Sequence, residues 1–173
     1  MRTQTGFSLI ELLIVVAIIL IIAAIAIPNL LQARMLANES SAGAGLHVLQ
    51  TAEITYNNSY PTVGYANTLG QLGGATPCAP AVATACIIDN LLATATPGSG
   101  GKNGYYYQAT GTVSGGATFN TAYIVGAAPI TVHSTGNRDF CSTNDATLRA
   151  QLATAGDLPV TTEAACVAYP AAL

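Results

Sequence analysis

An apolar run dominates the N-terminal part of the chain. It covers residues 7–27, FSLIELLIVVAIILIIAAIAI, and only Ser8 and Glu11 interrupt it. A helix rises about 1.5 Å per residue, so this run spans roughly 30 Å, the thickness of a bilayer's hydrocarbon core. Residues 1–6, MRTQTG, hold one cation, Arg2, which favours a cytoplasmic N-terminus and export of the rest of the chain. The run therefore predicts a helix that lies in a membrane or another apolar environment.

A second helical pattern continues after Pro28. Apolar residues recur there at spacings of three and four, which is typical of a helix with one buried face. The members of this stripe are Ala42, Leu46, Leu49, Ala52 and Tyr56. The polar residues that we expect to point elsewhere are Arg34, Asn38, Ser41 and Glu53.

The later part of the chain changes from helical to strand-like patterns. We expect the helix to reach about Asn58, with sites of bending or local melting at Pro28, Gly43 and Gly45. Residues 61–104, rich in Gly, Pro, Thr and Ala, predict a long connection with a short helix near residues 89–95. Aromatic and β-branched residues then predict strands at 104–110, 118–126 and 129–134. The expected fold is α+β, with an antiparallel sheet packed on the amphipathic half of the helix.

Charge and cysteines narrow the class of protein. Only 8% of the residues are charged, the formal net charge is −3, and Lys and Arg form no cluster, so we expect no specific nucleic-acid partner. The four cysteines lie beyond the apolar run without C-x-x-C spacing, which favours disulfides in an oxidising compartment over zinc. Three pairings are possible. We favour Cys78–Cys86, which closes a short loop, and Cys141–Cys166, which staples the C-terminal segment.

Glu11 is the unusual residue of the apolar run. A carboxylate there costs about 2.5–3.5 kcal/mol on insertion scales, so a compensating partner is expected. A cleaved secretory signal would need a small-residue site after the run, and Ala24 and Ala26 offer only a weak one. The segment Gly6-Phe7-Ser8-Leu9-Ile10-Glu11 resembles the N-terminal signature of type IV pilins and pseudopilins, a match that covers about 25 residues together with Pro28.

The resemblance implies both processing and shape. It implies that a prepilin peptidase cuts between Gly6 and Phe7 and methylates the Phe7 amine, and that Pro28 is the helix-kinking proline. Glu11 would then meet the amine of a neighbouring subunit as a register device, or its own Phe7 amine at i,i+4 spacing. The implied fold is the pilin lollipop: leader 1–6, helix half 7–31 in the membrane or filament core, and globular head 32–173. Within the head we expect a variable loop at 61–104, a sheet at 104–134 and a C-terminal disulfide loop at 141–166.

A second, weaker match lies near the end of the expected sheet. Bacterial major pilins often carry a glycine, a cation, a phenylalanine and an aspartate there, and Gly136, Arg138, Phe140 and Asp145 occupy these positions. The chain departs from the pattern at Ala146-Thr147, where a glycine is usual, so the resemblance does not extend to the final turn.

No motif indicates enzyme chemistry, a cofactor or a metal. His47 and His133 have no catalytic companions, and we expect both to be structural or exposed. The acidic residues of the C-terminal part predict a solvated rim, with calcium as the lesser alternative; they are Asp139, Asp145, Asp157 and Glu163.

The favoured function is a structural subunit of a type IV pilus, held in the inner membrane as a precursor and then exported into an extracellular homopolymer. The resemblance implies prepilin peptidase and the pilus assembly machinery as partners, with adhesion, motility or DNA uptake as roles of the whole pilus. The alternative is a pseudopilin of a type II secretion system. A membrane-anchored enzyme or binding module would need a convergent polar site.

Overall fold

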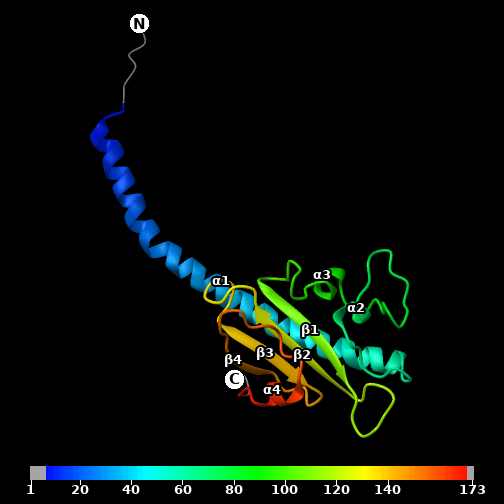
Figure 1. Cartoon of the computed structure of the whole chain (residues 1–173). Helices are drawn as coiled ribbons and strands as arrows, with labels where there is room; N and C mark the ends of the chain where they lie inside the picture. Colours follow the sequence, from blue (N-terminus) through cyan, green and yellow to red (C-terminus); the bar gives the residue numbers. More distant parts are fainter. Residues whose placement is uncertain (1–6, 171–173) are drawn as a thin grey trace. The chain divides into compact units, whose positions relative to one another are not determined.

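The computed structural model describes residues 7–170 and divides the chain into two compact units, one up to Arg34 and one from Met35 onward. Helix α1, Leu9–Ser59, runs through the boundary between them. The first unit consists of the apolar half of α1, and its side chains are exposed throughout apart from the half-buried Ala23. The second unit contains the remaining elements (Figure 1), so each unit is described by itself.

The second unit is built on a four-stranded antiparallel sheet in the order β1-β2-β3-β4 (Figure 1). The strands are β1, Tyr105–Thr112; β2, Ala122–Pro129; β3, Arg138–Thr143; and β4, Arg149–Leu152. The register places Tyr107 opposite Ala127, and Gly126 opposite Cys141. The sheet is therefore a simple meander in which every pair of neighbouring strands is also adjacent in sequence.

Two of the expected strands are present and the third is wrong. The strands expected at 104–110 and 118–126 correspond to β1 and β2, whereas β2 ends at Pro129 and the segment expected as a strand at 129–134 is a turn. His133 takes a left-handed φ of 64°, and the amide of Thr135 donates to the carbonyl of Thr131 at 2.9 Å. The sheet instead continues to residue 152 through β3 and β4. These two strands were not predicted, because their short, polar sequences resemble those of loops.

The inner face of the sheet packs against α1. The predicted apolar stripe is confirmed, because all five of its residues are at most 2% exposed. They share one core with inward side chains of β1 and β2, among them Tyr107, Tyr123 and Val125. Gly45 permits this approach: a Cβ placed on it would lie 2.8 Å from Cε1 of Tyr107. Neither Gly43 nor Gly45 melts the helix, which continues to Ser59.

Glu53 was predicted to point away from the buried stripe of α1, but its side chain lies on the buried face. Its side chain is fully buried and its Oε2 accepts a hydrogen bond from the amide of Ala66 at 2.8 Å. Position 53 lies four residues after Leu49 and three before Tyr56, so it belongs to the same face as the apolar stripe. The chain that leaves α1 then covers this end of the helix.

The long connection carries two short helices. These are α2, Leu69–Leu72, which was not predicted, and α3, Asn90–Ala93, which confirms the expected helix near 89–95. Asp89 caps α3 by accepting from the amide of Leu92 and also pairs with Lys102 at 2.9 Å. Cys78 is bonded to Cys86 within this connection.

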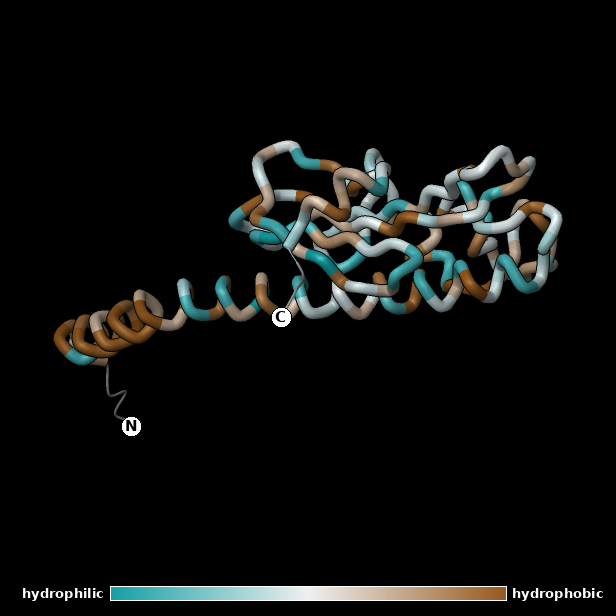
Figure 2. Tube along the Cα trace, turned by 90° about the horizontal axis from the view of Figure 1, so that it is seen from below, coloured by the Kyte–Doolittle hydropathy of each residue, from teal (hydrophilic) through white to brown (hydrophobic). Residues whose placement is uncertain are grey.

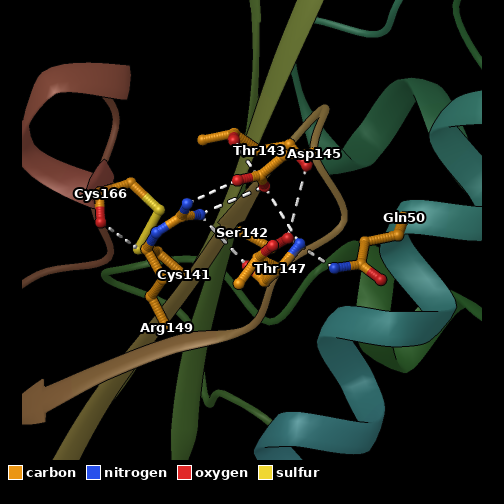
Figure 3. Close-up of a disulfide and its surroundings, with 8 residues drawn as sticks. All are labelled: Gln50, Cys141, Ser142, Thr143, Asp145, Thr147, Arg149 and Cys166. Atoms are coloured by element: carbon orange, nitrogen blue, oxygen red, sulfur yellow. Dashed lines mark hydrogen bonds and ion pairs between the residues drawn. A yellow bond between two sulfur atoms is a disulfide. The ribbon is translucent and has the colours of Figure 1, made fainter. Parts of the chain in front are cut away.

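A C-terminal strap, defined here as residues 157–170, covers the outer face of the sheet. It contains α4, Glu163–Val167, and the disulfide Cys141–Cys166 ties it to β3 (Figure 3). A Cβ on Gly126 would lie 2.8 Å from the backbone nitrogen of Val160, so the strap rests directly on β2. This cover explains why β2, unlike a strand with one wet face, is buried along almost its whole length.

Candidate processing and assembly site

The N-terminal end of α1 is capped by its own glutamate. Oε2 of Glu11 accepts a hydrogen bond from the amide of Ser8 at 3.0 Å, and the carbonyl of Ser8 accepts the first helical bond from Leu12 at 3.3 Å. A glutamate at the third helical position that reaches back to the N-cap amide forms half of a capping box. Glu11 therefore fixes where the helix begins, two residues after the expected cleavage point.

The structure describes two of the three residues expected at the processing site, Phe7 and Glu11. Gly6 lies outside the described residues, and Phe7 is 81% exposed. The backbone amide of Ser8 contacts the Glu11 carboxylate. The S-x-x-E spacing in the sequence is the signal that could have revealed the role of Ser8.

The first unit presents a bare apolar surface. All 17 large apolar side chains between Phe7 and Leu31 are at least 46% exposed. Figure 2 shows the hydrophobic colour concentrated in this part of α1. Full burial of one such side chain is worth about 1.5–3 kcal/mol, and these side chains are on average only about 60% exposed, so leaving this surface in water costs on the order of 20 kcal/mol. Such a surface requires an apolar partner.

By length and composition, α1 is the one helix of the described residues that could cross a membrane. Pro28 lies inside it. Because proline has no N–H, the carbonyl of Ala24 loses its usual helical donor. The helix is thus weakened at one defined point near the end of the apolar run.

Ion pairs position the turns of the second unit. Arg138 pairs with Glu39 of α1 at 3.2 Å, and the same carboxylate accepts from the amide of Asn137 at 2.8 Å. The Arg149 guanidinium bonds to Asp145 and holds the pKa of that carboxyl well below its usual range (Figure 3). These two cations therefore anchor the start of β3 and the β3–β4 turn.

The β3–β4 turn, where the chain departs from the major-pilin pattern, has an unusual backbone conformation. Ala146 takes a left-handed φ of 56°. Glycine adopts this conformation without the Cβ clash that other residues suffer, which explains why a glycine is usual there. The other pattern positions each have a contact: a Cβ on Gly136 would collide with the Tyr105 side chain, and Phe140 packs 6.1 Å from the Tyr105 ring centre.

The four acidic residues of the expected rim do not converge. Asp145 is paired with Arg149, Glu163 is exposed on α4, and only Asp139 and Asp157 lie next to each other. The prediction of a solvated rim is wrong for Asp139, which is 2% exposed beneath the strap. Among residues 7–170 no group of three or more His, Cys, Asp or Glu side chains could hold a metal ion.

The histidines are held by amides. Nδ1 of His47 lies 3.0 Å from Oε1 of Gln50, whose Nε2 donates to Oγ of Ser142, and Nδ1 of His133 lies 2.9 Å from Oδ1 of Asn137. Neither histidine faces a carboxylate or a nucleophile in these contacts.

The described residues thus combine an apolar helix that begins at a glutamate with a small disulfide-bonded head. Residues 1–27 match the family described as the prokaryotic N-terminal methylation motif. Over part of its length the chain is similar to type IV major pilins and to type II secretion system core proteins G.

Three relatives illustrate this similarity. The type IV wide pilus major component of Thermus thermophilus is 52% identical over 63 residues, which cover 35% of this chain and 48% of the relative. The type IV major pilin protein of Myxococcus xanthus is 51% identical over 51 residues, 30% of this chain and 23% of the relative. The type II secretion system core protein G of Vibrio cholerae is 40% identical over 65 residues, 36% of this chain and 44% of the relative. The matched segments thus span less than half the length of each relative.

Proposed function

We propose that the chain is a structural subunit of a type IV pilus. In this proposal it is cut between Gly6 and Phe7, methylated on the Phe7 amine, and polymerised through the apolar half of α1. The observation that carries the proposal is the bare apolar helix that begins at a glutamate-capped end. Such a helix is stable in a bilayer and equally stable among copies of itself, so one segment serves as membrane anchor and as filament core.

The geometry of Glu11 suggests how register is set. Oε2 is engaged by the Ser8 amide, and within residues 7–170 Oε1 has no hydrogen-bond partner. Cleavage would leave the Ser8 amide in place and create a positive amine at Phe7. Oε1 can then accept the amine of a neighbouring subunit while Oε2 keeps the helix capped. An unpaired buried charge is costly, so only the register that pairs the two groups is favoured.

Glu11 variants separate capping from charge. Glu11→Gln keeps an acceptor for the Ser8 amide but has no charge, and Glu11→Ala removes both. If charge pairing sets the register, both variants lose surface filaments by electron microscopy, whereas cleaved but unassembled subunit accumulates in the membrane. If Glu11→Gln assembles as the unchanged chain does, capping suffices and the register proposal is wrong.

Filament subunits make contacts that repeat without closing, as an open helical polymer requires. The proposal places the precursor in the inner membrane and the product in the extracellular pilus, with prepilin peptidase and the assembly machinery as partners. Adhesion, motility or DNA uptake would be roles of the assembled pilus.

A pseudopilin of a type II secretion system is the second candidate. It is favoured by the relative from Vibrio cholerae and by core protein G of Aeromonas hydrophila, which is 36% identical over 64 residues. The long connection and the two disulfides of the head favour a surface pilin instead.

Mass spectrometry of the N-terminal peptide from sheared cell-surface material tests the proposal. We expect an abundant peptide that begins at N-methylated Phe7. The same peptide found only in membranes would favour the pseudopilin. An N-terminus at Met1, or after Ala26, in cells with an active prepilin peptidase would refute both.

A further inference from the structure

The outer face of the sheet conceals a carboxyl group without a donor. Asp139 lies on β3, where Phe140 faces the core and Cys141 faces the strap, so the alternation of a strand places Asp139 on the strap side. It is 2% exposed, and neither of its carboxyl oxygens has a hydrogen-bond donor among the described residues. A carboxylate buried in this way is strongly disfavoured unless it is paired or protonated.

A second carboxyl group acts on the first and, after burial, is the main cause that raises the pKa of Asp139. It belongs to Asp157, the first residue of the strap. Asp157 is held in place by Thr154, whose amide donates to its Oδ2 at 2.6 Å and whose hydroxyl donates to its Oδ1 at 2.7 Å. These donors lower the pKa of Asp157, so its charge is the one that persists. Two carboxyl groups this close cannot both be ionised without repulsion, and one proton between them removes it.

The surroundings offer no cation to replace that proton. The register places Gln151 of β4 opposite Asp139, and Tyr169 packs from the strap. The side-chain amide of Gln151 lowers the pKa of Asp139, but burial and Asp157 outweigh it. Residues 35–170 contain three lysines and arginines, and each is paired with a carboxylate other than Asp139 or Asp157. The pairs are Lys102 with Asp89, Arg138 with Glu39 and Arg149 with Asp145. Glu163, the other acidic residue of the strap, is exposed on α4.

We propose that Asp139 and Asp157 share one proton that locks the C-terminal strap onto the outer face of the sheet, and that loss of this proton loosens the strap. Loosening exposes the apolar surface that the strap covers, including Ile124 and Gly126 of β2. The Cys141–Cys166 disulfide keeps the loosened strap tethered, so the movement is a local opening and not a detachment. This device belongs to the head and is independent of how the N-terminal helix is used.

The direction of the pH response follows from proton binding. Burial, with the Asp157 carboxylate second, raises the pKa of Asp139 to about 7, whereas a freely exposed aspartate titrates near pH 4. Opening therefore releases a proton between these two pH values. The opening equilibrium should rise by about tenfold for each pH unit from roughly pH 4 to 7 and level off above that.

Hydrogen exchange followed by mass spectrometry measures this opening directly. The full-length protein in detergent micelles, with EDTA present, is compared from pH 5 to pH 8 after correction for intrinsic exchange rates. The strap peptide reports opening, and a β1 peptide is the internal reference. We expect the corrected exchange of the strap to rise by at least about tenfold between pH 5 and 7 while β1 stays protected.

Three variants make the test specific. Asp139→Asn, which cannot lose a proton, should abolish the pH response. Asp157→Asn keeps an acceptor for Thr154 and should shrink the response without abolishing it, because burial of Asp139 remains. Glu163→Gln, which removes the exposed acidic residue of the strap, is the matched control and should leave the response unchanged.

Three results would overturn the proposal. The first is equal strap protection at pH 5 and pH 8 in the unchanged protein. The second is a pH response that persists in Asp139→Asn or is undiminished in Asp157→Asn. The third is protection at pH 8 that returns when calcium replaces EDTA, which would mean that the pair holds a cation and not a proton.

Discussion

Replacing Glu53 by glutamine tests how a buried carboxyl group limits the stability of the head. Glu53 is fully buried on α1, its Oε2 accepts from the Ala66 amide, and its Oε1 has no partner among the described residues. Burial raises its pKa from 4.5 to about 8, with the Ala66 amide opposing the change. The folded protein therefore holds this group protonated at neutral pH, whereas the unfolded chain does not.

The magnitude follows from this difference in proton binding. One pKa unit corresponds to about 1.4 kcal/mol, so between pH 4.5 and pH 7 the cost of keeping Glu53 protonated grows to about 3 kcal/mol. Stability from this group is fully present below pH 4.5 and is lost as the pH rises toward 8. Glu53→Gln imitates the protonated form, since its carbonyl can accept from Ala66. At pH 7 we expect the free energy of unfolding of the variant to be about 2–3 kcal/mol higher than that of the unchanged protein. At pH 4 we expect the two to be nearly equal.

Urea unfolding of the full-length protein in detergent micelles, followed by tyrosine near-ultraviolet dichroism at several pH values, measures this difference. Glu163→Gln, which removes an exposed carboxylate of α4, is the control and should leave the pH dependence nearly unchanged. The reasoning would be refuted if Glu53→Gln and the unchanged protein had the same pH dependence. It would also be refuted if the variant were destabilised equally at every pH.

Three further perturbations probe the head, each measured by urea unfolding under the same conditions. Ala146→Gly should stabilise by about 0.5–1 kcal/mol because it relieves the left-handed backbone at φ 56°; a loss of stability would contradict this. Cys141→Ser combined with Cys166→Ser should cost about 3 kcal/mol, more than opening the shorter disulfide of the long connection, because the sequence separations are 25 and 8 residues; equal costs would contradict the loop-length argument. Gly45→Val should destabilise by about 2 kcal/mol or more because its side chain would enter the ring of Tyr107, and an unchanged midpoint would show that the helix can shift away from the sheet.

The length of helix α1 and its buried apolar stripe could be predicted from the sequence. A long apolar run with one glutamate and one proline has few structural solutions, and local periodicity was sufficient to identify the buried stripe of the next segment. The Ser8–Glu11 cap is also encoded locally, because the S-x-x-E spacing is the pattern of a capping box.

The later part was harder because its contacts are long-range. Residues 129–134 look like a strand by composition, yet the chain turns at His133. The strand that pairs with β2 on the side away from β1 is instead the polar segment β3. Edge strands and turns depend on which segment lies alongside, and a single sequence does not contain that information.

Local sequence therefore determined the apolar helix, its capped start, its buried stripe and the presence of cysteines suited to an oxidising compartment. Tertiary structure alone decided the fate of two acidic residues. Glu53 and Asp139 look like surface carboxylates in the sequence, but the chain after α1 covers one and the C-terminal strap covers the other. The physical reason is that solvation of a carboxyl group depends on every segment that packs over it, and those segments lie far away in the sequence.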